Sequence, residues 1–363
     1  TTAHDDWGLW AMNVFANQRH FLWGVSMMLV VLFIVYPGIR TLPSAPVWKI
    51  RNAGRLIPVL ALTAVFPYWH GSVLISMLCM LFVMALFAKE KLMFLATGIT
   101  GVLFSLLSSG FFSGGASNVV KPQLYWGFLA DDRSLPGVAV YLFKVVGIAL
   151  IFIVAIPFTR ISRDKMIFFA SASSLIVFAF TVSLTPDVTV NHKYIILAVG
   201  LLNILIADLY LTLWQKIRQI RNSAPAAALI SGTLAVFIGF SLFATGFVEF
   251  IGYYNKNVSS VSVDLKAPLI KWLKENTEPD DVFLTAPYHM NTFFFSGRKV
   301  FYGWPYYTMT AGHDTQSRLE EVNDLFSGCG GDPESFRNKA SKYKIRYAII
   351  DDELRNHEGY TVA

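Results

Sequence analysis

The sequence predicts a polytopic α-helical membrane protein of about eight spans with a small C-terminal extracytoplasmic α/β domain. Of its 363 residues, 54% are apolar and 15% are charged, whereas an ordinary soluble domain has about 25% charged residues. Residues 1–253 contain 17 Lys or Arg and 9 Asp or Glu, while residues 254–363 contain 13 and 15. We therefore expect a transmembrane helical domain at 1–253 and an extracytoplasmic α/β domain at 254–363.

The composition also excludes several classes of protein. A chain this apolar is neither a soluble globular enzyme nor a disordered protein. The net charge of +6 does not indicate nucleic-acid binding, because no basic cluster lies on a foldable soluble surface. The two cysteines, Cys79 and Cys329, do not have the spacing of metal ligands. We therefore expect membrane lipid, and no nucleic acid, as a partner.

Eight apolar segments are candidates for membrane helices, since a bilayer core about 30 Å thick needs about 20 mostly apolar residues. In chain order they are Phe21–Tyr36, Leu56–Trp69, Ser72–Ala88, Leu92–Phe112, Val138–Phe158, Met166–Leu184, Tyr194–Trp214 and Ala226–Tyr253. The second segment is short and contains Pro58 and Pro67. It is therefore either a kinked span or a half-inserted helix.

The loop charges predict the orientation, because Lys and Arg accumulate in cytoplasmic loops. One set of alternate loops holds twelve such residues: Arg40, Lys49, Arg51, Arg55, Lys89, Lys91, Arg160, Arg163, Lys165, Lys216, Arg218 and Arg221. The other set holds four: Arg19, Lys121, Arg133 and Lys193. Both chain ends and loops 113–137 and 185–193 are therefore expected outside the cytoplasm. Because residues 1–6 contain no targeting segment, we also expect upstream spans beyond this chain.

The C-terminal part alternates short strands with helices, which is typical of a parallel α/β domain. The expected strands are Val282–Thr285, Lys299–Tyr302 and Tyr347–Ile350, and the expected helices run from a cap at Asp264 through Asn276 and over Met290–Phe295, Gln316–Phe326 and Pro333–Tyr343. The Gly- and aromatic-rich loop 303–314 leaves the carboxyl end of the second strand, where parallel sheets place ligands. Tyr306 and His313 in this loop are candidates for substrate binding. Alternatively, the loop packs on the membrane domain or its headgroups, and His313 only precedes the cap of the next helix.

Several short motifs resemble those of bacterial polytopic proteins of the GT-C glycosyltransferase superfamily. They are Asn17-Gln18-Arg19-His20 before a span, Phe66-Pro67-Tyr68-Trp69-His70-Gly71 between two spans, Pro122-Gln123-Leu124-Tyr125-Trp126-Gly127 in an outer loop and Asn191-His192-Lys193 before another span. The entry into the soluble domain, Lys271 to Val282, is similar as well. The resemblance is spread over nearly the whole chain, and it depends on the order of the motifs.

This resemblance implies a membrane enzyme that transfers a sugar from a polyprenyl-phosphate donor on the extracytoplasmic face. The catalytic carboxylate of the superfamily lies in the first outer loop, after the first span, and that region has no counterpart in this sequence. The tail also lacks the Trp-Trp-Asp-Tyr-Gly motif of oligosaccharyltransferases, which puts recognition of a peptide sequon in doubt. We expect a lipid-linked sugar as substrate, with the missing N-terminal portion or other membrane subunits as possible partners.

Glycosyl transfer from a lipid phosphate needs a carboxylate to accept a proton and cations or a divalent metal to neutralise the departing phosphate. Asp131 and Asp132 are the candidate carboxylates, and they are either sugar or metal ligands or part of a solvated loop. The candidate phosphate-binding residues on the outer side are His70, Lys121, Arg133, His192 and Lys193. For His192-Lys193, at a helix N-terminus, the alternative is an interfacial anchor. For His70, it is a hydrogen-bonded structural histidine.

Two charged residues lie inside predicted spans. Lys144 falls about two turns from the outer end of its span and is expected either to bind a ligand or to extend towards the headgroups. Asp208 falls near the cytoplasmic end of its span and is expected to pair with a basic loop residue. The rival to the glycosyltransferase hypothesis is a non-catalytic integral membrane scaffold subunit of a larger complex, because the expected N-terminal catalytic loop is absent.

Overall fold

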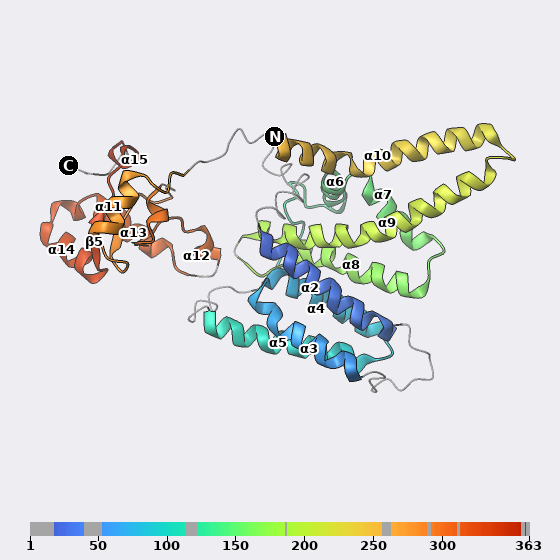
Figure 1. Cartoon of the computed structure of the whole chain (residues 1–363), viewed down its shortest axis with the longest axis horizontal. Helices are drawn as coiled ribbons and strands as arrows, with labels where there is room; N and C mark the ends of the chain where they lie inside the picture. Colours follow the sequence, from blue (N-terminus) through green and yellow to red (C-terminus); the bar gives the residue numbers. More distant parts are fainter. Residues whose placement is uncertain are drawn as a thin grey trace. The chain divides into compact units, whose positions relative to one another are not determined.

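The computed structural model describes residues 18–39, 53–112, 122–185, 187–255, 263–288, 292–310, 313–356 and 360. The chain divides into two compact units, of which unit 1 ends at Asn257 and unit 2 continues from Val258 to the C-terminus. Figure 1 shows that unit 1 is built from long helices, while unit 2 combines short helices with short strands. Each unit has its own hydrophobic core.

Five helices of the described part of unit 1 are long and apolar enough to cross a membrane. They are α2 (Arg19–Val35), which the 3-10 turn η2 (Tyr36–Ile39) extends, α5 (Lys91–Phe112), α8 (Arg163–Thr181), α9 (His192–Ile220), which η7 (Val188–Asn191) precedes, and α10 (Pro225–Asn255). They coincide with five of the eight predicted segments. Unit 1 is therefore a membrane-embedded helical bundle.

The other three predicted segments are shorter or broken. Helix α3 (Leu56–Val65), followed by η4 (Phe66–Tyr68), has 10 residues, and α4 (Gly71–Phe87) has 17. The segment predicted at 138–158 consists of α6 (Leu135–Val146) and α7 (Ala149–Ala155) with η6 (Ile156–Phe158), bent by 119°. This pair is either one broken span or a re-entrant loop.

A single glycine explains why the expected continuous helix at 138–158 is wrong. Gly147 has φ +66° and ψ −148°, a combination that is nearly exclusive to glycine. Its amide donates to the carbonyl of Phe143 at 2.7 Å and closes the last turn of α6. Lys144 consequently lies exposed in that last turn, rather than two turns into a continuous span.

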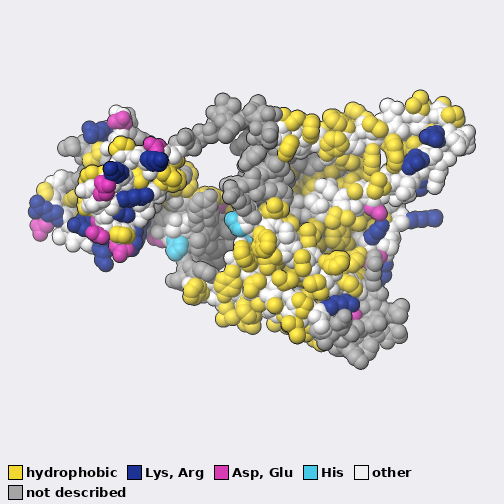
Figure 2. All heavy atoms as spheres, viewed as in Figure 1, with side chains coloured by type: hydrophobic (Ala, Val, Ile, Leu, Met, Phe, Trp, Pro, Cys, Tyr) yellow, Lys and Arg dark blue, Asp and Glu magenta, His cyan; other side chains and the backbone are white. Residues whose placement is uncertain are grey.

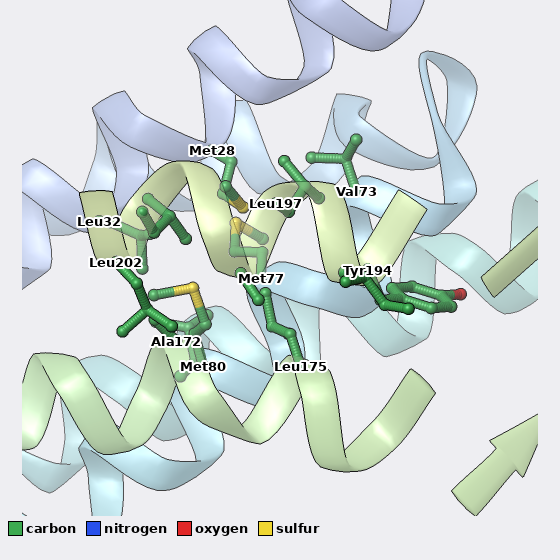
Figure 3. Packing of buried hydrophobic residues seen from close by; sticks show 14 of the residues in the cluster. Met28, Leu32, Val73, Met77, Met80, Ala172, Leu175, Tyr194, Leu197 and Leu202 are labelled. Carbon is green, nitrogen blue, oxygen red and sulfur yellow. The ribbon is translucent and has the colours of Figure 1, made fainter. Parts of the chain in front are cut away.

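The core of unit 1 lies between α2, α4, α8 and α9, which pack side by side (Figure 1). Its buried side chains include Met28 and Leu32 from α2, Met77 and Met80 from α4, Leu175 from α8, and Leu197 and Leu202 from α9 (Figure 3). Methionine is flexible enough to fill the gaps between helices that cross at different angles. This packing holds the helix ends in fixed positions at both ends of the bundle.

The two ends of unit 1 differ in their side chains, as Figure 2 shows. We call one the basic end, defined by Arg55, Lys89, Lys91, Arg160, Arg163, Lys165, Lys216, Arg218 and Arg221. We call the opposite one the histidine end, defined by Gln18, His20, His70, Tyr125, Arg133, Asn191, His192 and Lys193. A mostly hydrophobic surface separates them, as expected for a bundle surrounded by lipid. The described basic residues of the predicted cytoplasmic loops all belong to the basic end.

Unit 2 contains a three-stranded parallel sheet in the order β4-β3-β5. Strand β3 (Val282–Leu284) pairs with β4 (Lys299–Val300) on one side and β5 (Ile345–Ala348) on the other. Successive side chains of a strand point to opposite faces. Leu284 accordingly packs with residues of α13 (Gln316–Phe326), while Phe283 packs with residues of α11 (Pro268–Asn276) and η9 (Thr292–Ser296). The predicted parallel pairing is confirmed.

Some boundaries in unit 2 differ from those predicted. Helix α11 begins at Pro268 because Asp264 accepts the amide of Lys266 at 2.8 Å in a separate turn. The segment predicted as a helix at 290–295 is the 3-10 turn η9 over its described part. Helix α14 (Pro333–Lys342) agrees with the prediction, whereas α12 (Tyr306–Thr310) and α15 (Asp352–Arg355) were not predicted. The guanidinium of Arg298 donates to the carbonyls of Leu273 and Thr277 and caps the end of α11.

Candidate functional site

The histidine end brings together four motifs that are far apart in the sequence. Gln18 and His20 begin α2, His70 caps α4, and Asn191 to Lys193 begin α9. The loop at 122–134 joins them, because β1 (Gln123–Leu124) pairs antiparallel with β2 (Val182–Ser183) at the end of α8. Neither of these short strands was predicted. We take this end as the candidate functional site.

His70 is a buried histidine, with 7% of its surface exposed. Its Nδ1 accepts the amide of Val73 at 3.4 Å, so the ring proton is on Nε2, which lies 3.5 Å from Oε1 of Gln18. The ring of His20 stacks on it with centroids 5.1 Å apart. Burial, and then the charges of Lys193 and His20, lower the pKa of His70 to about 3. His70 is therefore a neutral hydrogen-bond donor at physiological pH.

Lys193 and His192 have different environments, although they are adjacent in the sequence. Lys193 is half-buried, and it forms no ion pair with any residue that the structure describes. His192 is buried, and its Nδ1 contacts the carbonyl of Thr189. The cation of this predicted pair is thus Lys193, which is close enough to His70 to affect its pKa.

Asn191 connects the loop at 122–134 to the helix ends. Its side-chain amide donates to Tyr125 Oη at 2.9 Å, to the carbonyl of Ala179 at 3.0 Å and to that of Val182 at 2.6 Å. Tyr125 also donates its hydroxyl to Ala179, and burial raises the pKa of Tyr125 to about 12. Nothing in the sequence indicates this role of Asn191 beyond the motifs to which Tyr125 and Asn191 each belong. The motifs themselves were the only signal.

Arg133 is held beside this network by its own loop. Its backbone carbonyl accepts the indole N–H of Trp126 at 2.7 Å. Gly127, with φ +98°, leaves room for its side chain, because a Cβ at position 127 would lie 3.2 Å from Cγ of Arg133. The positive charge of Arg133 acts on Tyr125 and partly offsets the effect of burial on the pKa of Tyr125. Arg133 therefore lies near Tyr125, and Lys193 follows Asn191 by two residues in the chain, so both cations border the Tyr125–Asn191 network.

The two candidate carboxylates lie in an exposed turn before α6. Asp132 Oδ1 accepts the amide of Ser134 at 2.8 Å, and Oδ2 accepts its hydroxyl at 2.7 Å. These hydrogen bonds lower the pKa of Asp132. A Cβ at Gly137 would lie 2.4 Å from Cγ of Asp132, so this turn depends on glycine there. Asp132 thus has a local structural role, and Asp131 is exposed beside it.

Unit 2 carries the remaining candidates. Tyr306 begins α12, and the exposed His313 donates its amide to the carbonyl of Thr308 at 3.1 Å. Asp314 accepts the amides of Gln316 and Ser317 at the start of α13. Beside the strand ends, the rings of Tyr288, Tyr302 and Trp304 form a cluster, and Tyr288 and Trp304 are largely exposed.

Lys121 lies outside the described residues. Among the residues that are described, no group of three or more His, Cys, Asp or Glu lies close enough together to hold a metal ion. Comparisons with protein-family models, curated proteins and solved structures found no match for this chain.

Proposed function

We propose that the histidine end binds the phosphate of a polyprenyl-phosphate-sugar donor, and that the protein is a GT-C-like membrane glycosyltransferase. The observation that carries this proposal is the half-buried Lys193 beside the neutral donor His70, with no ion pair to a described acidic residue. An uncompensated, partly desolvated cation is stabilised by an anion. A phosphate monoester or diester supplies that charge and accepts several hydrogen bonds.

The level of the site along the bundle supports a lipid-linked ligand. Trp23 and Trp69 lie at the histidine end with ring centroids 6.0 Å apart, and their exposed fractions are 56% and 47%. Exposed tryptophans concentrate at the membrane interface, where lipid headgroups lie. The phosphate of a polyprenyl lipid would therefore reach Lys193 while its chain stayed in the bilayer.

We infer that this end faces away from the cytoplasm, because the basic end carries the larger number of Lys and Arg. In this arrangement the eight apolar segments all enter the membrane, with α6 and α7 as one broken span. Unit 2 then follows α10 on the extracytoplasmic side of a bacterial inner membrane.

The reaction forms a bond between the acceptor oxygen and the anomeric carbon and breaks the bond from that carbon to the donor phosphate. The departing phosphate keeps the electron pair, and the acceptor proton passes to a base. Lys193 and Arg133 would stabilise the charge on the phosphate, while Nε2–H of His70 would donate to one of its oxygens in place of Oε1 of Gln18. The base is not assigned, because Asp132 is engaged with Ser134.

The proposal is tested by measuring binding of an undecaprenyl-phosphate sugar to the chain in nanodiscs. Lys193→Gln and His70→Gln should each weaken binding about tenfold or more, since charge-assisted hydrogen bonds contribute about 1.5–3 kcal/mol. Lys144→Gln is the matched control, because Lys144 is an exposed cation on α6. Unchanged binding in both variants would contradict the proposal. Release of sugar onto an acceptor would then test transfer itself.

A scaffold subunit is the second candidate, and α10 favours it. Only 6% of its most apolar stretch is buried within the chain, and large side chains such as Phe237, Phe240 and Phe247 are exposed. Partner helices would cover such a surface as well as lipid does. A stable stoichiometric complex that binds no lipid-linked sugar would support this function over the first.

A further inference from the structure

A small cavity at the basic end is lined by two cationic side chains and one carboxylate. It has a volume of 360 Å³ and lies between η6, the following residues Thr159 to Ile161, and the second half of α9. Arg160, Asp208 and Lys216 line it, together with Thr159 and Thr212. It exists because α7 ends at η6, where Pro157 turns the chain and brings Arg160 opposite α9.

The carboxylate in this cavity is already neutralised. Asp208 Oδ2 lies 2.8 Å from Nζ of Lys165, so the expected pairing of Asp208 with a basic loop residue is confirmed. Arg160 and Lys216 form no ion pair with any residue in the described part of the chain. The cavity therefore has an excess of positive charge, and an anion is the complementary ligand.

An apolar groove continues directly from the cavity. This groove, also of 360 Å³, lies between α7, α9 and α10, and Leu213 and Lys216 line both spaces. Away from Lys216 its lining is almost entirely apolar and includes Phe152, Leu234 and Ile238. Tyr210, which lines the groove, donates its hydroxyl to the carbonyl of Ala235 at 2.8 Å and so holds α9 to α10.

We propose that the cavity and the groove together bind one anionic glycerophospholipid. Its phosphate lies between Arg160 and Lys216, and one acyl chain follows the groove past Leu213 and Leu234. A cationic pocket continues into an apolar channel past Leu213 and Lys216, which line both spaces, and this matches the order of charge and hydrocarbon in such a lipid. Basic pockets between membrane helices recognise anionic headgroups in this way. The site is independent of the sugar-donor site at the opposite end.

The chain offers a matched control for this proposal. Arg218 and Arg221 lie at the same end, but they line a different groove on α9 and α10, together with Trp214 and Leu229. Arg160→Gln with Lys216→Gln removes two positive charges, and Arg218→Gln with Arg221→Gln removes the same number. If the basic end attracts anionic lipid only in a general way, both double variants should lose the same amount of bound lipid. If the lipid binds at a specific site, only Arg160→Gln/Lys216→Gln should lose it.

The experiment uses native mass spectrometry to measure the lipid that stays bound to the chain. The chain is taken from nanodiscs of phosphatidylcholine in which about one lipid in five is phosphatidylglycerol. We expect one retained phosphatidylglycerol per chain. The affinity for this lipid should fall about 30-fold in Arg160→Gln/Lys216→Gln, since each of the two cations contributes about 1 kcal/mol. Retention should persist in Arg218→Gln/Arg221→Gln. Equal losses in both double variants, or no loss in the first, would overturn the proposal.

Two further measurements separate the lipid from its headgroup alone. Leu234→Trp fills the groove without changing a charge, and it should reduce retention of phosphatidylglycerol. Soluble glycerol phosphate should not compete at millimolar concentration if the acyl chain contributes to binding. Competition by glycerol phosphate, or full retention in a folded Leu234→Trp variant, would show an anion site without a lipid channel and would contradict the proposal. Circular dichroism of each variant would show whether its helices remain folded.

Discussion

The two ends of unit 1 present positive charge in different ways. At the basic end five of the nine cations that define it are exposed, and one of the half-buried ones, Lys165, is paired with Asp208. At the histidine end there are fewer cations, and Lys193 is half-buried beside a buried histidine and a hydrogen-bonded loop. The number of cations predicts which side of the membrane an end faces. Their desolvation, in contrast, determines how strongly an end interacts with a single anion.

The largest expected effect concerns Asn191, which organises the histidine end. Asn191→Leu should destabilise unit 1 by about 2–4 kcal/mol, because it removes the donor to Tyr125 Oη and to the carbonyls of Ala179 and Val182, of which only Ala179 keeps another donor, the hydroxyl of Tyr125. Thermal unfolding in detergent measures the loss. The control is Asn203→Leu, since Asn203 is exposed on the same helix, where a leucine side chain would face lipid. Equal stability of the two variants would show that the loop at 122–134 does not depend on Asn191.

The pH dependence of the histidine end gives the next largest effect. The pKa of His70 is about 3 in the folded protein, below its usual value of 6.5, so the unfolded state binds more protons between these values. Stability should therefore fall as the pH is lowered from 6.5, by up to about 1.4 kcal/mol per pH unit. In His70→Gln this part of the dependence should disappear, which unfolding at pH 7, 6 and 5 would measure. A bound phosphate should raise the pKa of His70, and an identical profile with and without ligand would contradict its proximity to the site.

A smaller effect is expected at Gly127, which makes room for Arg133. Gly127→Ala should cost about 1–2 kcal/mol, because alanine is strained at φ +98° and its Cβ would crowd Cγ of Arg133. Gly200→Ala is the control, since Gly200 lies inside α9 with open space around it. That change should be neutral or stabilising by up to about 1 kcal/mol. Donor binding should weaken only in the first variant if the position of Arg133 matters.

The smallest effect is expected at the ion pair of the basic end. Lys165 and Asp208 are 39% and 48% exposed, so Asp208→Asn should change stability by less than about 1 kcal/mol. The same substitution increases the positive charge at the cavity and should strengthen retention of phosphatidylglycerol. Weaker retention would mean that Asp208 contributes a hydrogen bond to the lipid, rather than limiting its attraction.

Much of the fold could be predicted because it depends on local patterns. Long apolar runs identify membrane helices, and alternating short strands and helices indicate the parallel sheet of unit 2. The break at Gly147 could not be predicted with the same certainty, because glycine is also common inside membrane helices. The strand pair β1–β2 has two residues in each strand, which is too short for a periodic signal.

The sequence by itself determined that the chain is a membrane protein with an asymmetric distribution of charge, because hydrophobicity and charge are properties of the residues and do not depend on their arrangement. Only the tertiary structure decided which candidates lie close together. It placed His70 with Lys193 and Tyr125 with Asn191, and it placed Arg160 opposite Lys216 at the other end. These pairs are far apart in the sequence, and their proximity results from the packing of helices whose contacts have no signature in any single segment.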